Sequence, residues 1–225
     1  MKKFFLSMLV SVAALVSFAQ TSVQASEKFV KAMEQKLVGF DSVRSNEGLQ
    51  DLANSFERIA EAEKTQWLPY YYAALSNVNL GFNHAIAAGP MGGNADKVDP
   101  LADKAEKLLN KADELSKDNS EIYVVKKLIA SLRMLGDVMN RYMTYGPVAM
   151  EALATAKKLN PENPRVYVLE GSDLFNTPEE YGGNKVEAKR LLEESLKKFE
   201  TFKPESSIHP TWGMGQAKYF LSQIK

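Results

Sequence analysis

Apolar residues recur at intervals of three and four from Glu27 onward, and no stretch shows the alternation that is typical of a strand. This spacing places apolar side chains on one face of an α-helix. It predicts four helices with a single apolar face, with stripes in residues 49–60, 108–115, 153–159 and 191–199. Broader apolar content between them predicts three more enclosed helices, at 67–82, 122–139 and 166–175. The sequence therefore predicts an all-α fold.

The segment KLNPENPRVYVLEG, residues 158–171, shows how two of these helices are joined. Pro161 cannot continue the helix that ends at Leu159, because proline lacks the backbone N–H and clashes with the preceding turn. Pro164 suits the first turn of the next helix, with Asn163 as its N-cap. A connection this short predicts that consecutive helices lie antiparallel and in contact.

A weak internal repeat accompanies these connections. Segments beginning at Ala105, Ala149 and Ala188 share an alanine, apolar residues three and four positions later, and alanine or serine seven positions later, and a similar segment begins at Ala53. Small residues at this spacing allow helices to approach closely. A helix pair with one apolar stripe must bury it on further pairs, which predicts a stacked array.

These segments resemble the second helices of tetratricopeptide repeats (TPRs), and KLNPENPRVYVLEG resembles the link between two such repeats. Tyr167 stands at the aromatic position of the following helix, and Gly171 at its small position. The resemblance covers residues 49–199, about three and a half units. It implies antiparallel helix pairs stacked as a TPR-like right-handed superhelix, an α-solenoid, within a single domain at 26–225. A helix at about 210–225, with Trp212, Tyr219, Phe220 and Leu221, is expected to cover the end of the stack.

Two connections depart from the TPR pattern, since residues 85–100 and 176–185 are too long for its tight turns. Each contains Gly-Gly-Asn, at Gly92–Asn94 and Gly182–Asn184. Consecutive backbone N–H groups of this kind can bind an anion. No Lys-Ser/Thr follows, as it does in a phosphate-binding loop, and glycine and asparagine also serve turns that need positive φ. Loop geometry is the favoured explanation, and a functional role stays open.

Residues 1–25 have the pattern of an export signal. Lys2 and Lys3 precede an apolar run, and small residues lead to an expected cleavage after Ala25. The run is shorter than the roughly 20 residues that span a bilayer, so we expect no membrane insertion after cleavage. The chain is therefore expected to be exported, periplasmic or secreted, and soluble.

Composition narrows the function further. Removal of the two signal lysines leaves 26 basic and 28 acidic residues, a net charge near −2 with no basic block, which argues against a nucleic-acid partner. Cysteine is absent, and only His84 and His209 offer imidazoles; both are expected to be surface or capping residues. No spacing indicates a nucleophile or a metal site. We therefore expect a binding protein that is not an enzyme and uses no metal or cofactor.

Polar residues on the first helices are the candidate binding site. The side chains of Tyr72, Ser76, Asn79 and Asn83 share one helical face. TPR arrays line their concave groove with first-helix side chains, so the resemblance makes this stripe a candidate groove. Tyr packing between helices and Asn bonding to loop carbonyls explain it equally well. Arg165 and Ser172 would face the same groove in the register set by Gly171.

Two functions follow from this interpretation. The first is a non-enzymatic TPR-type scaffold or adaptor that presents a groove to an unidentified protein or peptide in the periplasm. The alternative is a small-molecule-binding accessory component of a periplasmic solute transport system. An open groove favours a peptide, whereas a closed pocket with convergent polar groups favours a metabolite.

Overall fold

The computed structural model describes residues 26–89 and 93–224, so the predicted signal peptide lies outside the described residues. Nine α-helices and no strand occur in these two ranges, which confirms the all-α class. The helices are α1 (Glu27–Leu37), α2 (Asn46–Glu63), α3 (Trp67–Ala87), α4 (Ala95–Leu115), α5 (Ser120–Gly136), α6 (Val138–Leu159), α7 (Pro164–Asn176), α8 (Lys185–Thr201) and α9 (Met214–Gln223). Two 3₁₀ turns, η1 (Phe40–Ser42) and η2 (Glu179–Tyr181), lie in connections.

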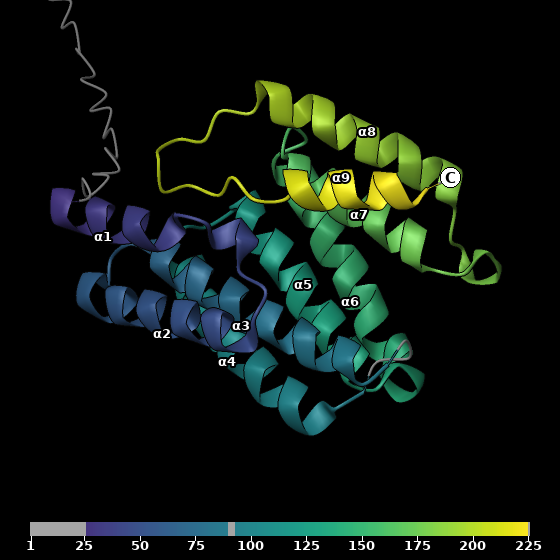
Figure 1. Ribbon diagram of the computed structural model, residues 1–225, viewed down its shortest axis with the longest axis horizontal. Coiled ribbons are helices and arrows are strands. Elements are labelled where there is room, and N and C mark those ends of the chain that lie inside the picture. The colour runs from purple at the N-terminus through teal and green to yellow at the C-terminus, as the bar shows by residue number, and fades with distance from the viewer. Residues whose placement is uncertain (1–25, 90–92, 225) are drawn as a thin grey trace, which may run out of the picture.

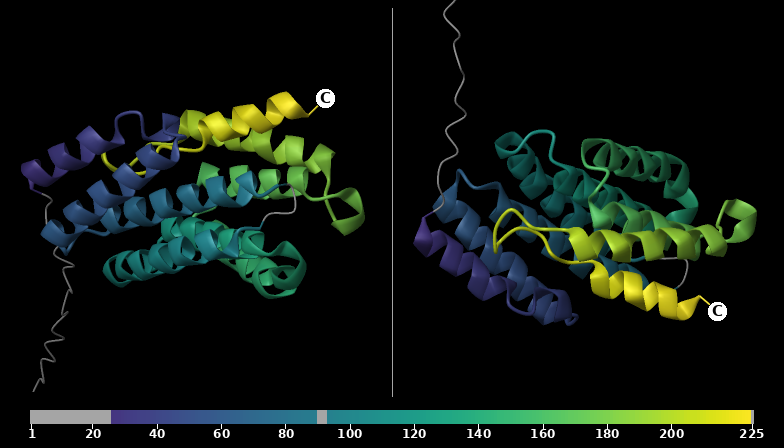
Figure 2. Two further views of the ribbon diagram at one scale, coloured as in Figure 1. Left: turned by 60° about the horizontal axis from the view of Figure 1, so that its bottom comes forward. Right: turned by 90° about the horizontal axis from the view of Figure 1, so that it is seen from above.

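Helices that follow one another in sequence pack side by side through most of the fold (Figure 1). α2 packs on α3, α3 on α4, α5 on α6 and α7 on α8. α3, α5 and α7 are the most enclosed helices, as their apolar content predicts, whereas α2, α4 and α8 bury one face. α9 packs against α8 and α7. It lies at the opposite side of the molecule from α1 and α2 (Figure 2).

Small residues of the predicted repeat lie at these helix contacts. The alanines that begin the four segments and the small residues seven positions later are all buried, namely Ala53, Ala60, Ala105, Ala112, Ala149, Ala156, Ala188 and Ser195. Gly171 lies so close to α8 that a Cβ there would be 2.9 Å from Cγ of Leu192 and 3.2 Å from the Ala188 carbonyl oxygen. The predicted close approach at Gly171 is therefore confirmed.

The link between α6 and α7 has the predicted boundaries. α6 ends at Leu159, α7 begins at Pro164, and the Asn163 side chain accepts a hydrogen bond from the backbone N–H of Arg165 at 3.1 Å. This cap satisfies one of the N–H groups that have no partner within the helix.

Three boundaries differ from the prediction. The helix predicted at 122–139 is divided at Asp137, which caps α6, and the first half of α6 was not predicted. The first long connection is shorter than predicted, because α3 extends to Ala87 and α4 begins at Ala95. Pro100 lies inside α4, close enough to its start that the loss of one hydrogen bond does not end the helix.

Candidate functional site

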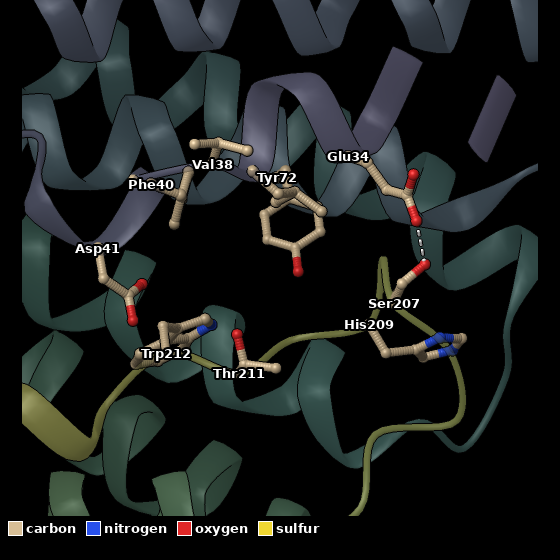
Figure 3. A pocket seen from close by; sticks show the side chains of 11 residues that line it. Glu34, Val38, Phe40, Asp41, Tyr72, Ser207, His209, Thr211 and Trp212 are labelled. Carbon is tan, nitrogen blue, oxygen red and sulfur yellow. Dashed lines mark hydrogen bonds between the residues drawn. The ribbon is translucent and has the colours of Figure 1, made fainter. Parts of the chain in front are cut away.

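A cavity of about 400 Å³ lies where three distant parts of the chain meet (Figure 3). The end of α1 and the turn after it form one wall, and Tyr72 of α3 lies at its base. The opposite wall comes from residues 202–213, which join α8 to α9 without helix or strand and which we call the strap. The lining residues are Glu34, Leu37, Val38, Gly39, Phe40, Asp41, Tyr72, Ser207, His209, Thr211 and Trp212. We call this space the strap cavity.

Side-chain contacts hold the strap in place. The Ser207 hydroxyl donates to the Glu34 carboxylate at 2.6 Å and so ties the strap to α1. Ile208 is buried in the main core. Trp212 is also buried there, and its indole N–H donates to the Tyr71 hydroxyl at 2.8 Å. Trp212 was predicted to cover the exposed end of the stack; it lies instead in the central core, because the strap runs back across the fold before α9 begins.

Behind Trp212 lies a buried ion pair between Arg165 of α7 and Glu121 of α5. The Arg165 side chain is fully buried, and its Nε lies 2.9 and 2.8 Å from the two Glu121 carboxylate oxygens. Arg165 Nη1 donates to the Trp212 carbonyl oxygen at 3.3 Å, and Tyr71 and Asn163 donate to Glu121 at 3.2 and 2.7 Å. We call these five residues the Arg165–Glu121 cluster. It joins α3, α5 and α7 to the strap and so supports one wall of the cavity.

Electrostatics keep Arg165 charged within this cluster. Burial by itself disfavours the charged guanidinium, but the adjacent Glu121 carboxylate raises the pKa of Arg165 above its ordinary value. Burial, together with the charge of Glu121, raises the pKa of Tyr71 well above its ordinary value. Tyr71 therefore remains a neutral hydrogen-bond donor to Glu121.

Tyr72 presents the most informative polar atom of the cavity. The residue is only 2% exposed, and its ring stacks on Phe56 at 5.2 Å and meets Phe40 edge-on at 5.3 Å. Its hydroxyl points into the strap cavity (Figure 3). No hydrogen bond joins this hydroxyl to another of the described residues. Because it faces the cavity and has no partner among these residues, this hydroxyl is available to a ligand.

Charge in the cavity is negative. Glu34 and Asp41 contribute carboxylates, and the lining includes no lysine or arginine. Although Asp41 is an exposed residue, the protein around its carboxyl removes hydration and raises its pKa, an effect that Arg44 and Arg165 oppose. Because both side chains are acidic and no lysine or arginine lines the cavity, an anionic group of a ligand would be repelled from this wall.

His209 lies partly buried at the cavity, where its ring meets Trp67 edge-on at 5.7 Å. Nδ1 lies 2.8 Å from the Ser206 hydroxyl, and Nε2 lies 3.3 Å from the Glu205 carboxylate. Burial lowers the pKa of His209 below 6.5, although Glu205 and Glu121 oppose the shift. The folded strap therefore favours the neutral form of the His209 imidazole.

The substitution His209→Gln should make stability less sensitive to acid. The unfolded imidazole takes up a proton near its ordinary pKa of 6.5, whereas the folded one resists it, so this site lowers the free energy of unfolding as pH falls through 6.5. Urea unfolding at about pH 7.5 and about pH 5.5 measures the effect. The unmodified protein should lose more stability than His209→Gln between these pH values. Equal losses would contradict the lowered pKa of His209.

The structure brings only one of the predicted site residues into the cavity. Tyr72, Ser76, Asn79 and Asn83 share a face of α3, but that face packs toward α2 and η1, as the ring contacts of Tyr72 and the hydrogen bond from Asn83 to α2 show. The Ser76 hydroxyl donates to the Tyr72 carbonyl oxygen, and the Asn83 amide donates to the Arg44 carbonyl oxygen and to Asn46. A ligand contact by Ser76, Asn79 or Asn83 stays a prediction.

The two predicted residues of α7 have partners within the protein. Arg165 belongs to the buried ion pair, and the buried Ser172 hydroxyl donates to the Leu169 carbonyl oxygen at 2.9 Å. Val168, on the same helix, packs in a cluster with Leu192 and Phe199. Arg165 therefore acts on the cavity through Trp212 and does not line it.

Sequence reasoning missed most of the cavity lining. The turn after α1 and the strap are not amphipathic, so periodicity does not identify them. The local signal was IHPTWG, residues 208–213, in which histidine precedes a proline and tryptophan precedes a glycine in a segment that joins helices. Aromatic residues on such a connection are expected to pack against the domain or to line a site.

Neither a metal site nor a membrane-spanning helix is found among the described residues. The described residues hold no group of three or more His, Asp or Glu side chains that could bind a metal ion. Among the helices at 26–89 and 93–224, none has both the length and the apolar character needed to cross a membrane.

Comparison with known proteins gives one informative match. No protein-family model and no curated protein sequence matches the chain. Among solved structures, the chain is similar to the HusA haemophore from Porphyromonas gingivalis, with 32% sequence identity and a TM-score of 0.75. The match covers 88% of this chain and 92% of that chain.

Proposed function

The chain belongs to the family of the HusA haemophore, and on that premise we propose that it is an exported protein that binds haem without catalysing a reaction. The observation that carries this proposal is the match along nearly the whole of both chains. A haemophore is a haem carrier, so the comparison favours the small-molecule alternative over the peptide scaffold. The predicted export signal at residues 1–25 agrees with such a role.

The TPR-like superhelix is part of the same proposal. Buried small residues at the repeated positions of the four segments and the close approach at Gly171 support stacked helix pairs. Small-angle X-ray scattering tests the superhelix, since a curved array has a more elongated profile than a globule of equal mass.

We place the haem in the strap cavity. Its volume of about 400 Å³ lies within the range of about 300–1,000 Å³ that is usual for ligand sites. Phe40, Tyr72 and Trp212 supply aromatic surface for the porphyrin, and the free Tyr72 hydroxyl supplies a polar contact. Because Glu34 and Asp41 would repel the propionates, the porphyrin enters with its propionate edge facing solvent.

Filling the cavity should weaken haem binding. The substitution Thr211→Trp adds an indole at an exposed lining residue, so we expect at least about a tenfold weaker affinity with the fold intact. Thr201→Trp adds the same side chain at an exposed residue of α8 that does not line the cavity, and is the matched control. Titration with haemin, followed at the Soret band, measures both. If Thr211→Trp binds as tightly as the control, the cavity is not the site; if the unmodified protein binds no haemin, the function itself is wrong.

Removal of one acidic charge should strengthen haem binding. Asp41→Asn keeps the size of the side chain and removes a carboxylate that repels the propionates, so we expect a several-fold tighter affinity for haemin at low salt. Asp51→Asn, on exposed α2 surface outside the cavity lining, is the control. Salt should reduce the difference between Asp41→Asn and the unmodified protein. An unchanged affinity would contradict the proposed orientation of the porphyrin.

Iron ligation by Tyr72 is disfavoured. Tyrosine and histidine both hold haem iron in other proteins. Burial raises the pKa of Tyr72 well above its ordinary value, so its phenol resists the deprotonation that ligation needs. We therefore expect Tyr72→Phe to weaken haemin and iron-free protoporphyrin by similar factors. A loss confined to haemin would instead identify Tyr72 as an iron ligand.

A further inference from the structure

Exposed methionines form a stripe along α6, far in sequence from the strap cavity. Met139, Met143 and Met150 are 80%, 81% and 71% exposed. They stand four and seven residues apart, so they follow one face of the helix. Burial in a core explains none of them, and the proposed haem site does not use them.

Helix formation does not explain the choice of methionine here. Leucine has a similar helix propensity, and polar residues such as glutamine or lysine would stabilise an exposed helix equally well without leaving apolar surface in water. What methionine adds is a polarisable thioether sulfur on a side chain with three rotatable bonds. Thioether sulfur is a soft ligand that selects Cu(I) over hard cations.

The spacing of the first two methionines suits a shared ion. Residues four apart on a helix have Cβ atoms about 5–6 Å apart, so two flexible side chains can bring their sulfur atoms to one metal ion. Met150 lies roughly 10 Å further along the axis than Met143, from a rise of about 1.5 Å per residue, and is too distant to join them. The pair is therefore Met139 and Met143, and Met150 is a built-in control.

Charge on this part of α6 does not oppose a cation. Arg141 is the only basic residue of the helix before Lys157, and the Asp99 carboxylate neutralises it through two hydrogen bonds of 2.6 and 2.8 Å. The Asp137 carboxylate lies at the start of the helix, where it caps Asn140. The chain has no cysteine, so no thiolate competes for a soft ion.

We propose that Met139 and Met143 form a binding site for a soft monovalent cation, Cu(I), separate from the strap cavity. Two sulfur ligands leave further coordination positions open, which is typical of a site that exchanges its ion. The site needs no movement of the backbone, because both side chains already lie in solvent.

Silver ion is the probe, because Ag(I) has the same preference for sulfur and no redox chemistry under these conditions. In the full chain with methyl-labelled methionine, we expect one equivalent of Ag(I) to shift the Met139 and Met143 methyl resonances together, while Met150 and Met214 stay unchanged. The double substitution Met139→Leu with Met143→Leu should weaken silver binding at least about tenfold, whereas Met150→Leu should retain it. Leucine preserves helix propensity and size, and circular dichroism checks the fold.

Three outcomes would overturn the proposal: no methyl shift at stoichiometric Ag(I), equal shifts of all exposed methionines, or undiminished binding by the double variant. The first would leave the stripe as an apolar contact surface, and the second would show only general thioether affinity. The haemin titration is a separate experiment, so failure of either site leaves the other untouched.

Discussion

Replacing Arg165 with methionine should lower the free energy of unfolding by about 3–5 kcal/mol, which is typical for the loss of one partner from a buried ion pair. Among the described residues, the Glu121 carboxylate would keep only Tyr71 and Asn163 as donors, and its charge would lose the guanidinium that compensates it. Trp212 would also lose the Arg165 hydrogen bond to its carbonyl oxygen and the ring contact at 5.7 Å. Urea unfolding at neutral pH measures the change.

A matched control separates burial from charge. Arg190 pairs with Glu187 and Glu194 on the exposed surface of α8, where solvent screens the charges, so Arg190→Met should cost far less stability than Arg165→Met. Adding Glu121→Gln to Arg165→Met removes the uncompensated carboxylate and should recover part of the loss. Equal losses for Arg165→Met and Arg190→Met would show that the buried pair has no special role.

The Arg165–Glu121 cluster shows where sequence reasoning stops. Helical register places Arg165 on one face of α7, and the resemblance to TPR arrays assigned that face to an open groove. The partner, Glu121, stands 44 residues earlier, on a helix whose own pattern is ordinary. No local rule links the two positions, because their contact depends on how α5, α7 and the strap pack together.

Periodicity predicted helices best where one face is buried. α2, α4 and α8 follow this rule, and their stripes were predicted from spacing alone. The first half of α6 has exposed apolar residues and an internal proline, Pro147, so it lacks the pattern of a buried stripe. Similarly, the strap has no period, and its role depends on tertiary contacts such as that between Ser207 and Glu34.

The second Gly-Gly-Asn connection is explained by its geometry. Gly182 has φ of 95°, the Gly183 N–H donates to the Pro178 carbonyl oxygen at 3.0 Å, and Asn184 caps α8 by accepting from the Glu187 N–H at 3.0 Å. Each residue therefore has a structural task that its sequence type predicts. The first connection differs in its described part, since the Gly93 N–H donates to the Leu135 carbonyl oxygen of α5 at 2.7 Å and the Asn94 side chain makes no capping bond to α4.

The substitution Gly183→Ala should accordingly destabilise the protein by roughly 3 kcal/mol, at the upper end of the cost of overpacking. A Cβ at this position would overlap the backbone carbonyl group of Thr177, and a backbone neighbour cannot rotate away as a side chain can. The turn between α7 and α8 would have to open, which would also weaken the Asn184 cap. Thermal unfolding measures the loss.

Gly215→Ala is the control for this prediction, because it makes the same chemical change in α9, where a Cβ would have open space. Alanine is favoured over glycine inside a helix, so this variant should be as stable as the unmodified protein or more stable by about 0.5–1 kcal/mol. The two substitutions should therefore shift the melting temperature in different directions. If Gly183→Ala melts at the same temperature as Gly215→Ala, the connection tolerates a side chain. A role for its glycines beyond loop geometry would then have to be reconsidered.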